Sequence, residues 1–244
     1  MVISGPPLRT GASRLTAQAA LAAGAGLVTI LGTRDALAEH AAHVTAIMLR
    51  DHDEAFSAID DRVRALAIGP SAGLSDDLMQ DVATLLLRKI PIVLDADALT
   101  VFEAKPELLF AMLHKQAVLT PHEGEFARLF PDIALGDREQ AAKQAAAKSG
   151  ATVVLKGPIT CIAGPDGRTA ANNHSAPWLA TAGSGDVLTG LICGLLAQGI
   201  APFDAACIGA WLHGDIGVRG GAGLTADRML DLIPLVLSGC LSKE

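Results

Sequence analysis

Short apolar runs rich in β-branched residues recur along the chain, separated by longer segments rich in alanine and leucine. This alternation is typical of βαβ units that build a largely parallel sheet. A further pair of runs flanks Gly-Pro-Asp-Gly, which is typical of a hairpin turn. The predicted strands are Val2–Ser4, Leu27–Leu31, Leu66–Ile68, Ile92–Leu94, Ala117–Leu119, Thr152–Leu155, Thr160–Ala163 and Arg168–Ala171.

The helical segments between these strands carry recognisable end signals. Gly24 follows one of them and Gly199 follows another, as expected where a helix stops. Because no internal repeat, low-complexity tract or long polar linker interrupts the series, residues 1–244 are expected to form one domain. The predicted helices are Ser13–Ala23, Ser75–Arg88, Glu107–His114, Glu123–Phe130, Asp137–Ser149, Asp186–Gln198, Phe203–Val218 and Ala226–Leu237.

Composition narrows the class of protein. The chain has 244 residues, is 50% apolar and carries a formal net charge of −7, which allows a substantial core in a single α/β domain. Because its lysines and arginines form no cluster, nucleic acid is not expected as a partner. An acidic protein repels anions overall, so it must bind phosphate through local backbone N–H groups. Glycine-rich turns are therefore the segments to search.

Cysteine use and the N-terminal sequence predict the compartment. The cysteines are widely spaced in apolar surroundings and form no C-x-x-C pair, which favours buried free thiols in a reducing compartment. They are Cys161, Cys193, Cys207 and Cys240. The opening MVISGPPLRTG has no basic-then-apolar leader, and no stretch has the ~18 uninterrupted apolar residues of a membrane helix. We expect a soluble, cytoplasmic protein that forms a homo-oligomer.

Glycine-rich or acidic segments follow several of the predicted strands. Open parallel sheets bind ligands beyond the carboxyl ends of their strands, so these segments are the first candidates for a site. In chain order they read SGPPLRTG, GPSAG, DADAL, TPHEGE and KGPIT. A sixth segment, TAGSGD, precedes the helix predicted to start at Asp186.

The TAGSGD turn has the composition of an anion site. Its small residues let the backbone approach a ligand closely, and several N–H groups then point to one spot at the positive end of the helix dipole. A carboxylate in the first turn can orient or deprotonate a hydroxyl that attacks a bound phosphate, which makes Asp186 the candidate base. On this motif alone, a plain helix cap explains Asp186 about equally well.

The remaining segments carry a resemblance to a known family. The runs GAGLVTIL, AIGPSAG, PIVLDADAL, VLTPHEGEFARL, VVLKGPITCIAGPDG and LATAGSGDVLTGLICGLLAQG occur in the order and rough spacing of NAD(P)H-hydrate dehydratases of the ribokinase-like superfamily. They cover nearly the whole chain. TPHEGE and KGPIT distinguish this family from sugar kinases, which share the GxGD-type turn. The resemblance implies a three-layer α/β/α sandwich with a central, mostly parallel sheet.

The resemblance also implies an activity. Members repair the hydrated form of NADH or NADPH, in its S form, at the expense of ADP (yielding AMP) or ATP (yielding ADP). The hydroxyl of the hydrate is phosphorylated and leaves as phosphate, which restores the nicotinamide ring. Mg²⁺ is expected with the nucleotide, held mainly by phosphates and water, so no protein metal ligand is assigned.

Site residues follow from the matching motifs. Asp186 is expected to be catalytic and to contact the substrate, with Gly183, Ser184 and Gly185 as the anion hole. The predicted nucleotide contacts are Lys156, Gly157, Pro158, Ile159, Thr160 and Gly185. The other predicted substrate contacts are Ala12, Gly73 and His122. Ser71 and Ala72 depart from the family's GPGLG loop, and this leaves the geometry around Gly73 open.

Several other polar and aromatic residues are explained as well or better by structural roles. Asp95 and Asp97 are as well explained as caps of the next helix, and they receive no ligand role. His213 and Asp215 lie in a predicted helix without metal-ligand spacing, which favours a structural role. Trp178 precedes the TAGSGD turn and is a candidate lining residue, whereas Trp211 is expected in the core.

Two other functions remain open at this stage. A small-molecule kinase of the same superfamily, acting on a hydroxymethylpyrimidine, a thiazole alcohol or a sugar, would keep Asp186 and lack the elimination step. A non-catalytic nucleotide-binding module would keep the fold and have no need of a base. Dehydratases of this kind are often fused to an epimerase domain. The chain opens inside the first predicted strand, which leaves open whether an upstream segment is missing.

Overall fold

The computed structural model describes residues 1–52, 59–60 and 62–241, and within them nine strands form one sheet. The strand order is β3-β2-β1-β4-β5-β6-β7-β8-β9; neighbours from β3 to β7 run parallel, and β8 and β9 are antiparallel. The strands are β1 Val2–Ile3, β2 Thr29–Gly32, β3 Met48–Asp51, β4 Leu66–Ile68, β5 Ile92–Leu94, β6 Ala117–Leu119, β7 Thr152–Leu155, β8 Thr160–Ala163 and β9 Thr169–Asn172.

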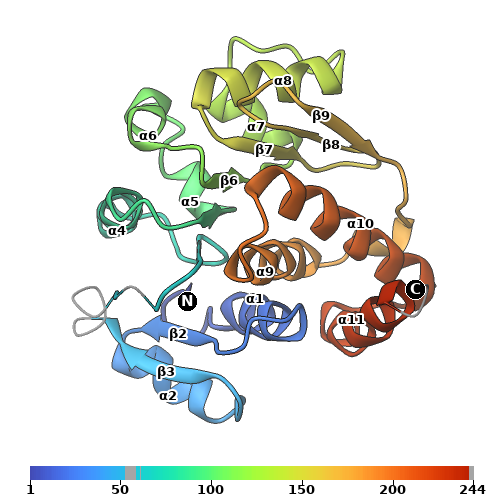
Figure 1. The fold of residues 1–244 in the computed structure, drawn as a ribbon. Helices are drawn as coiled ribbons and strands as arrows, with labels where there is room; N and C mark the ends of the chain where they lie inside the picture. The colour runs from blue at the N-terminus through green and yellow to red at the C-terminus, as the bar shows by residue number, and fades with distance from the viewer. Residues whose placement is uncertain (53–58, 61, 242–244) are drawn as a thin grey trace.

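Helices cover both faces of this sheet (Figure 1). One face carries α1 (Gly11–Ala22), α9 (Ser184–Ala197), α10 (Pro202–Gly220) and α11 (Ala226–Leu241). The other carries α4 (Asp76–Leu87), α5 (Asp97–Thr100), α6 (Pro106–Met112), α7 (Glu123–Leu129) and α8 (Arg138–Ser149). The short α2 (Arg34–Ala41) lies beside β3 at the edge of the sheet, and the 3-10 turn η1 (Pro177–Leu179) leads towards α9.

Alternation along the strands divides the interior into two cores. Successive side chains of a strand point to opposite faces, so Ile30 packs with the α1, α9, α10 and α11 layer and Leu31 packs with the opposite layer. Val93 and Leu94 divide in the same way in β5. Because the central strands are buried on both faces, they read in the sequence as continuous apolar runs.

Close packing of α9 on α1 positions the candidate catalytic turn. Gly190 and Gly194 lie on the same side of α9; a Cβ added at Gly190 would lie 2.3 Å from the carbonyl oxygen of Thr16, and one at Gly194 would lie 2.6 Å from that of Ala20. The two backbones therefore approach more closely than side chains would allow. Thr16 also donates its hydroxyl to the carbonyl of Asp186 at 3.1 Å, which ties the first turn of α9 to α1.

The strands that the sequence placed best are the buried ones. Leu66–Ile68, Ile92–Leu94, Ala117–Leu119, Thr152–Leu155 and Thr160–Ala163 agree with the structure residue by residue. The α2 helix and the β3 strand were not predicted. Met48–Asp51 is an edge strand with an exposed methionine and two charged residues, so it lacks an apolar run that would reveal it.

The structure bears on two predictions, that the cysteines are buried and that the chain has no membrane helix. Cys161 and Cys193 are buried as predicted, whereas Cys207 is only partly buried and Cys240, next to the last residue of α11, is exposed. Across the described ranges 1–52, 59–60 and 62–241, every helix is too short or too polar to cross a bilayer.

Candidate active site

A cavity of about 840 Å³ opens where the carboxyl ends of β5, β6 and β7 meet the N-terminus of α9. Strand ends contribute Asp95, His122 and Lys156, and the start of α9 contributes Ser184 and Asp186. An apolar wall from the 3-10 turn and α10 completes the cavity, with Pro177, Leu179, Ala180 and Ala210 among its residues. This is the position at which open α/β sheets bind ligands, and its size suits a nucleotide-sized molecule.

The glycine turn supplies backbone donors to this cavity. Gly183 caps α9 with a φ of +86°, and a Cβ there would lie 2.7 Å from a methyl of Leu15. Only glycine fits this conformation and this space. Within the part of the chain that the structure describes, the backbone N–H groups of Gly185 and Asp186 have no protein acceptor, and both residues line the cavity. The positive end of α9 therefore offers free donors to an anion.

The pKa of Asp186 is shifted towards neutral pH. Its carboxyl is partly buried, and this burial together with the nearby carboxylate of Asp95 raises the pKa of Asp186 to about 7, while Lys156 opposes the rise. A base is most effective when its pKa lies near the working pH. The predicted placement of Asp186 in the first turn of α9 is confirmed.

Lys156 is held by acidic partners at the strand ends. Its ammonium lies 2.7 Å from Oδ1 of Asp95 and 3.9 Å from Oε2 of Glu125. Burial lowers the pKa of Lys156, but the attraction of Asp95, Glu125 and Asp186 outweighs it, so the pKa lies above its usual value. A Cβ on Gly185 would lie 3.6 Å from this ammonium, so the charge faces the turn.

Asp95 links the sheet to the helix that carries the base. Its side chain is only 2% exposed, and its second oxygen accepts a hydrogen bond from Thr189 of α9 at 2.7 Å. Both carboxylate oxygens of Asp95 are therefore already bonded, one by Lys156 and one by Thr189. A buried carboxylate that accepts from two strong donors holds both of them in a fixed position.

His122 caps α7 and also faces the cavity. Its Nδ1 accepts from the backbone N–H groups of Gly124 and Glu125, and the Glu125 carboxylate accepts from the His122 N–H in return. Because Nδ1 accepts, the neutral ring carries its proton on Nε2. Nε2 lies 3.4 Å from Oε1 of Glu125, and the side chain is 55% exposed and lines the cavity. His122 therefore caps α7 and lines the cavity with the same ring.

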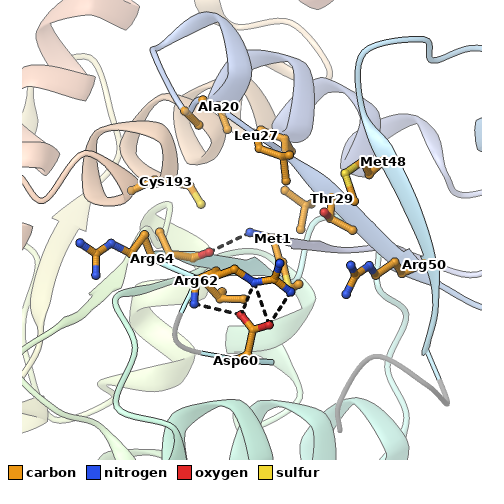
Figure 2. A pocket seen from close by; sticks show the side chains of 17 residues that line it. Met1, Ala20, Leu27, Thr29, Met48, Arg50, Asp60, Arg62, Arg64 and Cys193 are labelled. Carbon is orange, nitrogen blue, oxygen red and sulfur yellow. Dashed lines mark hydrogen bonds and ion pairs between the residues drawn. The ribbon is translucent and has the colours of Figure 1, made fainter. Parts of the chain in front are cut away.

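A smaller hollow lies at the opposite, amino-terminal end of the first strands (Figure 2). It has a volume of about 350 Å³ and is lined by residues such as Met1, Leu27, Met48 and Cys193. Arg62 at its edge is paired with Asp60 at 2.7 Å. The glycine turn and the strand-end carboxylates all lie at the other end of the sheet, so the larger cavity is the candidate active site.

Comparison with known families identifies the family of this chain. A sequence model of the family described as NAD(P)H-hydrate dehydratase matches residues 1–233. The chain belongs to the NAD(P)H-hydrate dehydratase family. The resemblance drawn from the six sequence runs is thereby confirmed.

Two curated relatives of the dehydratase family are similar to this chain. The bifunctional NAD(P)H-hydrate repair enzyme of Moorella thermoacetica is 40% identical over 258 aligned residues, which cover 97% of this chain and 48% of that enzyme. The ADP-dependent (S)-NAD(P)H-hydrate dehydratase of Neisseria meningitidis is 40% identical over 220 residues, covering 87% of this chain and 74% of the relative. The chain spans about half the length of the bifunctional relatives that it matches.

A solved structure of the dehydratase family has the same fold. The ADP/ATP-dependent NAD(P)H-hydrate dehydratase of Bacillus subtilis, co-crystallised with ATP and Mg²⁺, matches with a TM-score of 0.83 at 27% identity. The match covers 98% of this chain and 88% of that one. The predicted ribokinase-like sandwich with a mostly parallel sheet is confirmed.

The KGPIT segment of this dehydratase-family chain reaches the cavity only in part. Gly157, Pro158 and Thr160 line it, whereas Ile159 is 48% exposed and does not. Arg138 of α8 donates a hydrogen bond to the carbonyl of Lys156 at 3.0 Å and so helps to fix the start of this segment. The nucleotide contacts of these residues stay predictions.

Ala12 and Gly73 lie outside the cavity that holds Asp186. Ala12 is nearly buried at the start of α1. The Gly73 N–H donates to Asp97 at 2.8 Å, and a Cβ on Gly73 would approach no atom more closely than Nη1 of Arg9, at 4.0 Å. Gly73 therefore presents open backbone beside the DADAL loop. Its role as a substrate contact, like that of Ala12, stays a prediction.

Other interpretations change in the light of the structure. Trp211 is 41% exposed and stacks on His174, so the prediction that it lies in the core was wrong; it faces outward from α10. Trp178 is 43% exposed and is not among the cavity residues, although its neighbours Pro177 and Leu179 are. His213, assigned only a structural role, lines the cavity and contacts Ser184. Its spacing from the turn gave no sign of this contact.

The acidic groups near the turn are poorly arranged to hold a metal by themselves. Within residues 1–52, 59–60 and 62–241, no three His, Cys, Asp or Glu side chains are grouped as a metal site. Asp95 is occupied by Lys156 and Thr189, and one oxygen of Glu125 is occupied by the N–H of His122. A magnesium ion that arrives with nucleotide phosphates, keeping much of its water, fits this donor set better than a protein cage.

Proposed function

We propose that this chain dehydrates the S form of hydrated NADH or NADPH at the expense of an adenine nucleotide. The observation that carries the proposal is the position of Asp186. A carboxyl whose pKa is raised to about 7 lies in the first turn of a helix, beside free backbone donors, in a chain of the dehydratase family. The substrate class, hydrated NADH or NADPH, is inferred from the names of the similar relatives.

The chain's own groups supply the phosphoryl-transfer step. Asp186 accepts the proton of the hydrate's hydroxyl, and the hydroxyl oxygen forms a bond to the terminal phosphorus of the nucleotide. The bond between that phosphorus and the rest of the nucleotide breaks at the same time. Gly183, Ser184 and Gly185 stabilise the transferring group through the N-terminus of α9. ADP thereby yields AMP, and ATP yields ADP.

Elimination then completes the dehydration. The carbon–oxygen bond of the phosphorylated hydrate breaks with departure of inorganic phosphate, pushed by the ring nitrogen, and a neighbouring ring carbon loses a proton. The double bond of the nicotinamide ring is restored with no net oxidation or reduction. A phosphate is a far better leaving group than hydroxide, which is why a nucleotide is consumed.

The nucleotide is proposed to bind along KGPIT and the apolar wall. Gly157, Pro158 and Thr160 line the cavity on one side, and Leu179 and Ala210 line it on another. Lys156 contributes positive charge next to the turn, and Mg²⁺ is proposed to neutralise the phosphates. The relatives' names include ADP for Neisseria and ADP or ATP for Bacillus, and either nucleotide is a candidate for this chain.

Recovery of reduced-nicotinamide absorbance tests the proposal. The protein is mixed with S-form hydrated NADH or NADPH, Mg²⁺ and either ADP or ATP. Recovery that requires a nucleotide, releases phosphate and is lost in Asp186→Asn is expected. No recovery with either nucleotide would refute the proposal, and a stable phosphorylated alcohol from a hydroxymethylpyrimidine or thiazole alcohol would favour a kinase instead.

A further inference from the structure

A histidine from α10 contacts the anion turn. Nε2 of His213 lies 2.9 Å from the hydroxyl oxygen of Ser184 and 3.0 Å from the carbonyl oxygen of the same residue. Ser184 is the first residue of α9 and is 4% exposed. Both side chains line the active-site cavity, although His213 received no site role from the sequence.

The two contacts fix the tautomer of His213. A carbonyl oxygen only accepts hydrogen bonds, so Nε2 must carry the proton that it shares between the two oxygens of Ser184. Burial of the ring lowers the pKa of His213 to about 4, with Lys156 adding to the effect, so the ring is neutral near pH 7. His213 is therefore a fixed donor rather than a proton carrier.

The tautomer in turn fixes the Ser184 hydroxyl as an acceptor towards His213. A hydroxyl that accepts from one side keeps its own proton for another acceptor. Among the residues that the structure describes, His213 is the only partner of this hydroxyl oxygen. The free proton therefore belongs to whatever acceptor occupies the cavity beside the N-terminus of α9.

We propose that His213 is a positioning residue that turns the Ser184 hydroxyl proton towards the transferring phosphoryl group. This inference rests on the proposed function, because it assigns the Ser184 hydroxyl a role in the proposed phosphoryl transfer. The backbone N–H of Ser184 itself donates to the Thr181 carbonyl at 3.2 Å. The same Nε2–H holds the Ser184 carbonyl and so fixes the first turn of α9. Transition-state charge is stabilised best by donors that are already oriented before reaction.

Three variants separate orientation from packing. His213→Gln keeps an N–H at about the position of Nε2, His213→Leu removes the donor, and Ser184→Ala removes the hydroxyl. We expect His213→Leu and Ser184→Ala each to lower kcat by about 10- to 100-fold, with the KM for nucleotide changing by less than about 3-fold. His213→Gln should recover most of the loss.

The double variant gives the sharper result. If His213 acts through the hydroxyl, His213→Leu should cost little further kcat in the Ser184→Ala background, because the group that it orients is gone. Multiplicative losses, wild-type kcat in His213→Leu, or no difference between His213→Gln and His213→Leu would each overturn the proposal. Matching melting temperatures and nucleotide affinities establish that the variants remain folded.

A second measurement does not depend on turnover. The ¹⁵N NMR shifts of the His213 ring report its tautomer in the intact protein, and a neutral ring protonated on Nε2 is expected near pH 7. A proton on Nδ1 with Nε2 unprotonated would overturn the inference even in an inactive protein. Failure of the wild-type protein to restore the nicotinamide absorbance would instead refute the proposed function.

Discussion

The ammonium group of Lys156 lies 2.7 Å from Oδ1 of Asp95 and faces the glycine turn that carries Asp186. Asp95 and Lys156 act on the base in opposite directions: the carboxylate raises the pKa of Asp186, and the ammonium lowers it. Burial is the largest cause of the rise, and the net pKa is about 7. The two charges of the ion pair behind the turn adjust this pKa in opposite directions.

Replacing the base should separate activity from stability. Asp186→Asn is expected to lower kcat by about 100- to 10,000-fold, the range that a general base typically contributes. The folded state holds the Asp186 proton more tightly than the unfolded chain does, because its pKa is raised to about 7. The protein therefore loses stability as pH rises from about 4 to 7, and the loss is full above 7.

The asparagine variant cannot lose that proton, so it avoids this penalty. A pKa raised from 3.8 to about 7 corresponds to at most about 4 kcal/mol, and about 1 kcal/mol shifts the melting temperature of a domain of this size by about 2–4 °C. At pH 8 the melting temperature of the variant should therefore exceed that of the wild type by several degrees. The gain should shrink towards pH 4. Melting curves over this pH range are the measurement, and an equal gain at every pH would contradict the raised pKa.

The pH dependence of activity should respond to the ion pair in opposite ways. Activity requires ionised Asp186, so kcat/KM should fall as pH drops through about 7. Asp95→Asn removes the charge that raises this pKa, and the midpoint should move to lower pH. Lys156→Met removes the charge that lowers it, and the midpoint should move to higher pH. Midpoints that move in the same direction would show that the pair does not tune the base.

His122 should show two separable roles. His122→Asn retains a side chain that caps α7 well, whereas His122→Ala loses the cap at a cost of about 1 kcal/mol. Both lose the exposed Nε2–H. We expect the KM for the hydrated dinucleotide to rise several-fold in both variants, while only His122→Ala lowers the melting temperature. A wild-type KM in His122→Asn would mean that His122 serves the helix alone.

The contact between α9 and α1 should tolerate no added side chain. A Cβ at Gly190 would lie 2.3 Å from the Thr16 carbonyl oxygen, so Gly190→Ala should destabilise the fold by about 1–3 kcal/mol and displace the turn before Asp186. Gly239→Ala is the matched control. A Cβ at Gly239 in α11 would come no closer than 3.5 Å, to the end of the Arg219 side chain, and should stabilise by about 0.5–1 kcal/mol. Urea unfolding of both variants measures the difference.

Local sequence was sufficient for the buried framework. Leu66–Ile68 and Ile92–Leu94 are found where the apolar runs placed them, because strands covered on both faces must be apolar throughout. The edge strand Met48–Asp51 was missed for the converse reason, since its stability comes from pairing with β2 rather than from its own pattern. The TAGSGD turn and the position of Asp186 at the start of α9 could also be predicted, because glycines and a first-turn acid have direct local consequences.

The sequence by itself determined the layer order, the central strands, the dehydratase family and the position of Asp186. Only the tertiary structure decided what surrounds that base. Asp95 meets Thr189 across 94 residues of chain, and Lys156 meets Asp95 across 61. His213 reaches Ser184 because α10 packs beside α9. Such contacts depend on how the helices pack against the sheet and against one another. The periodicity of a single segment shows only which of its own faces is buried.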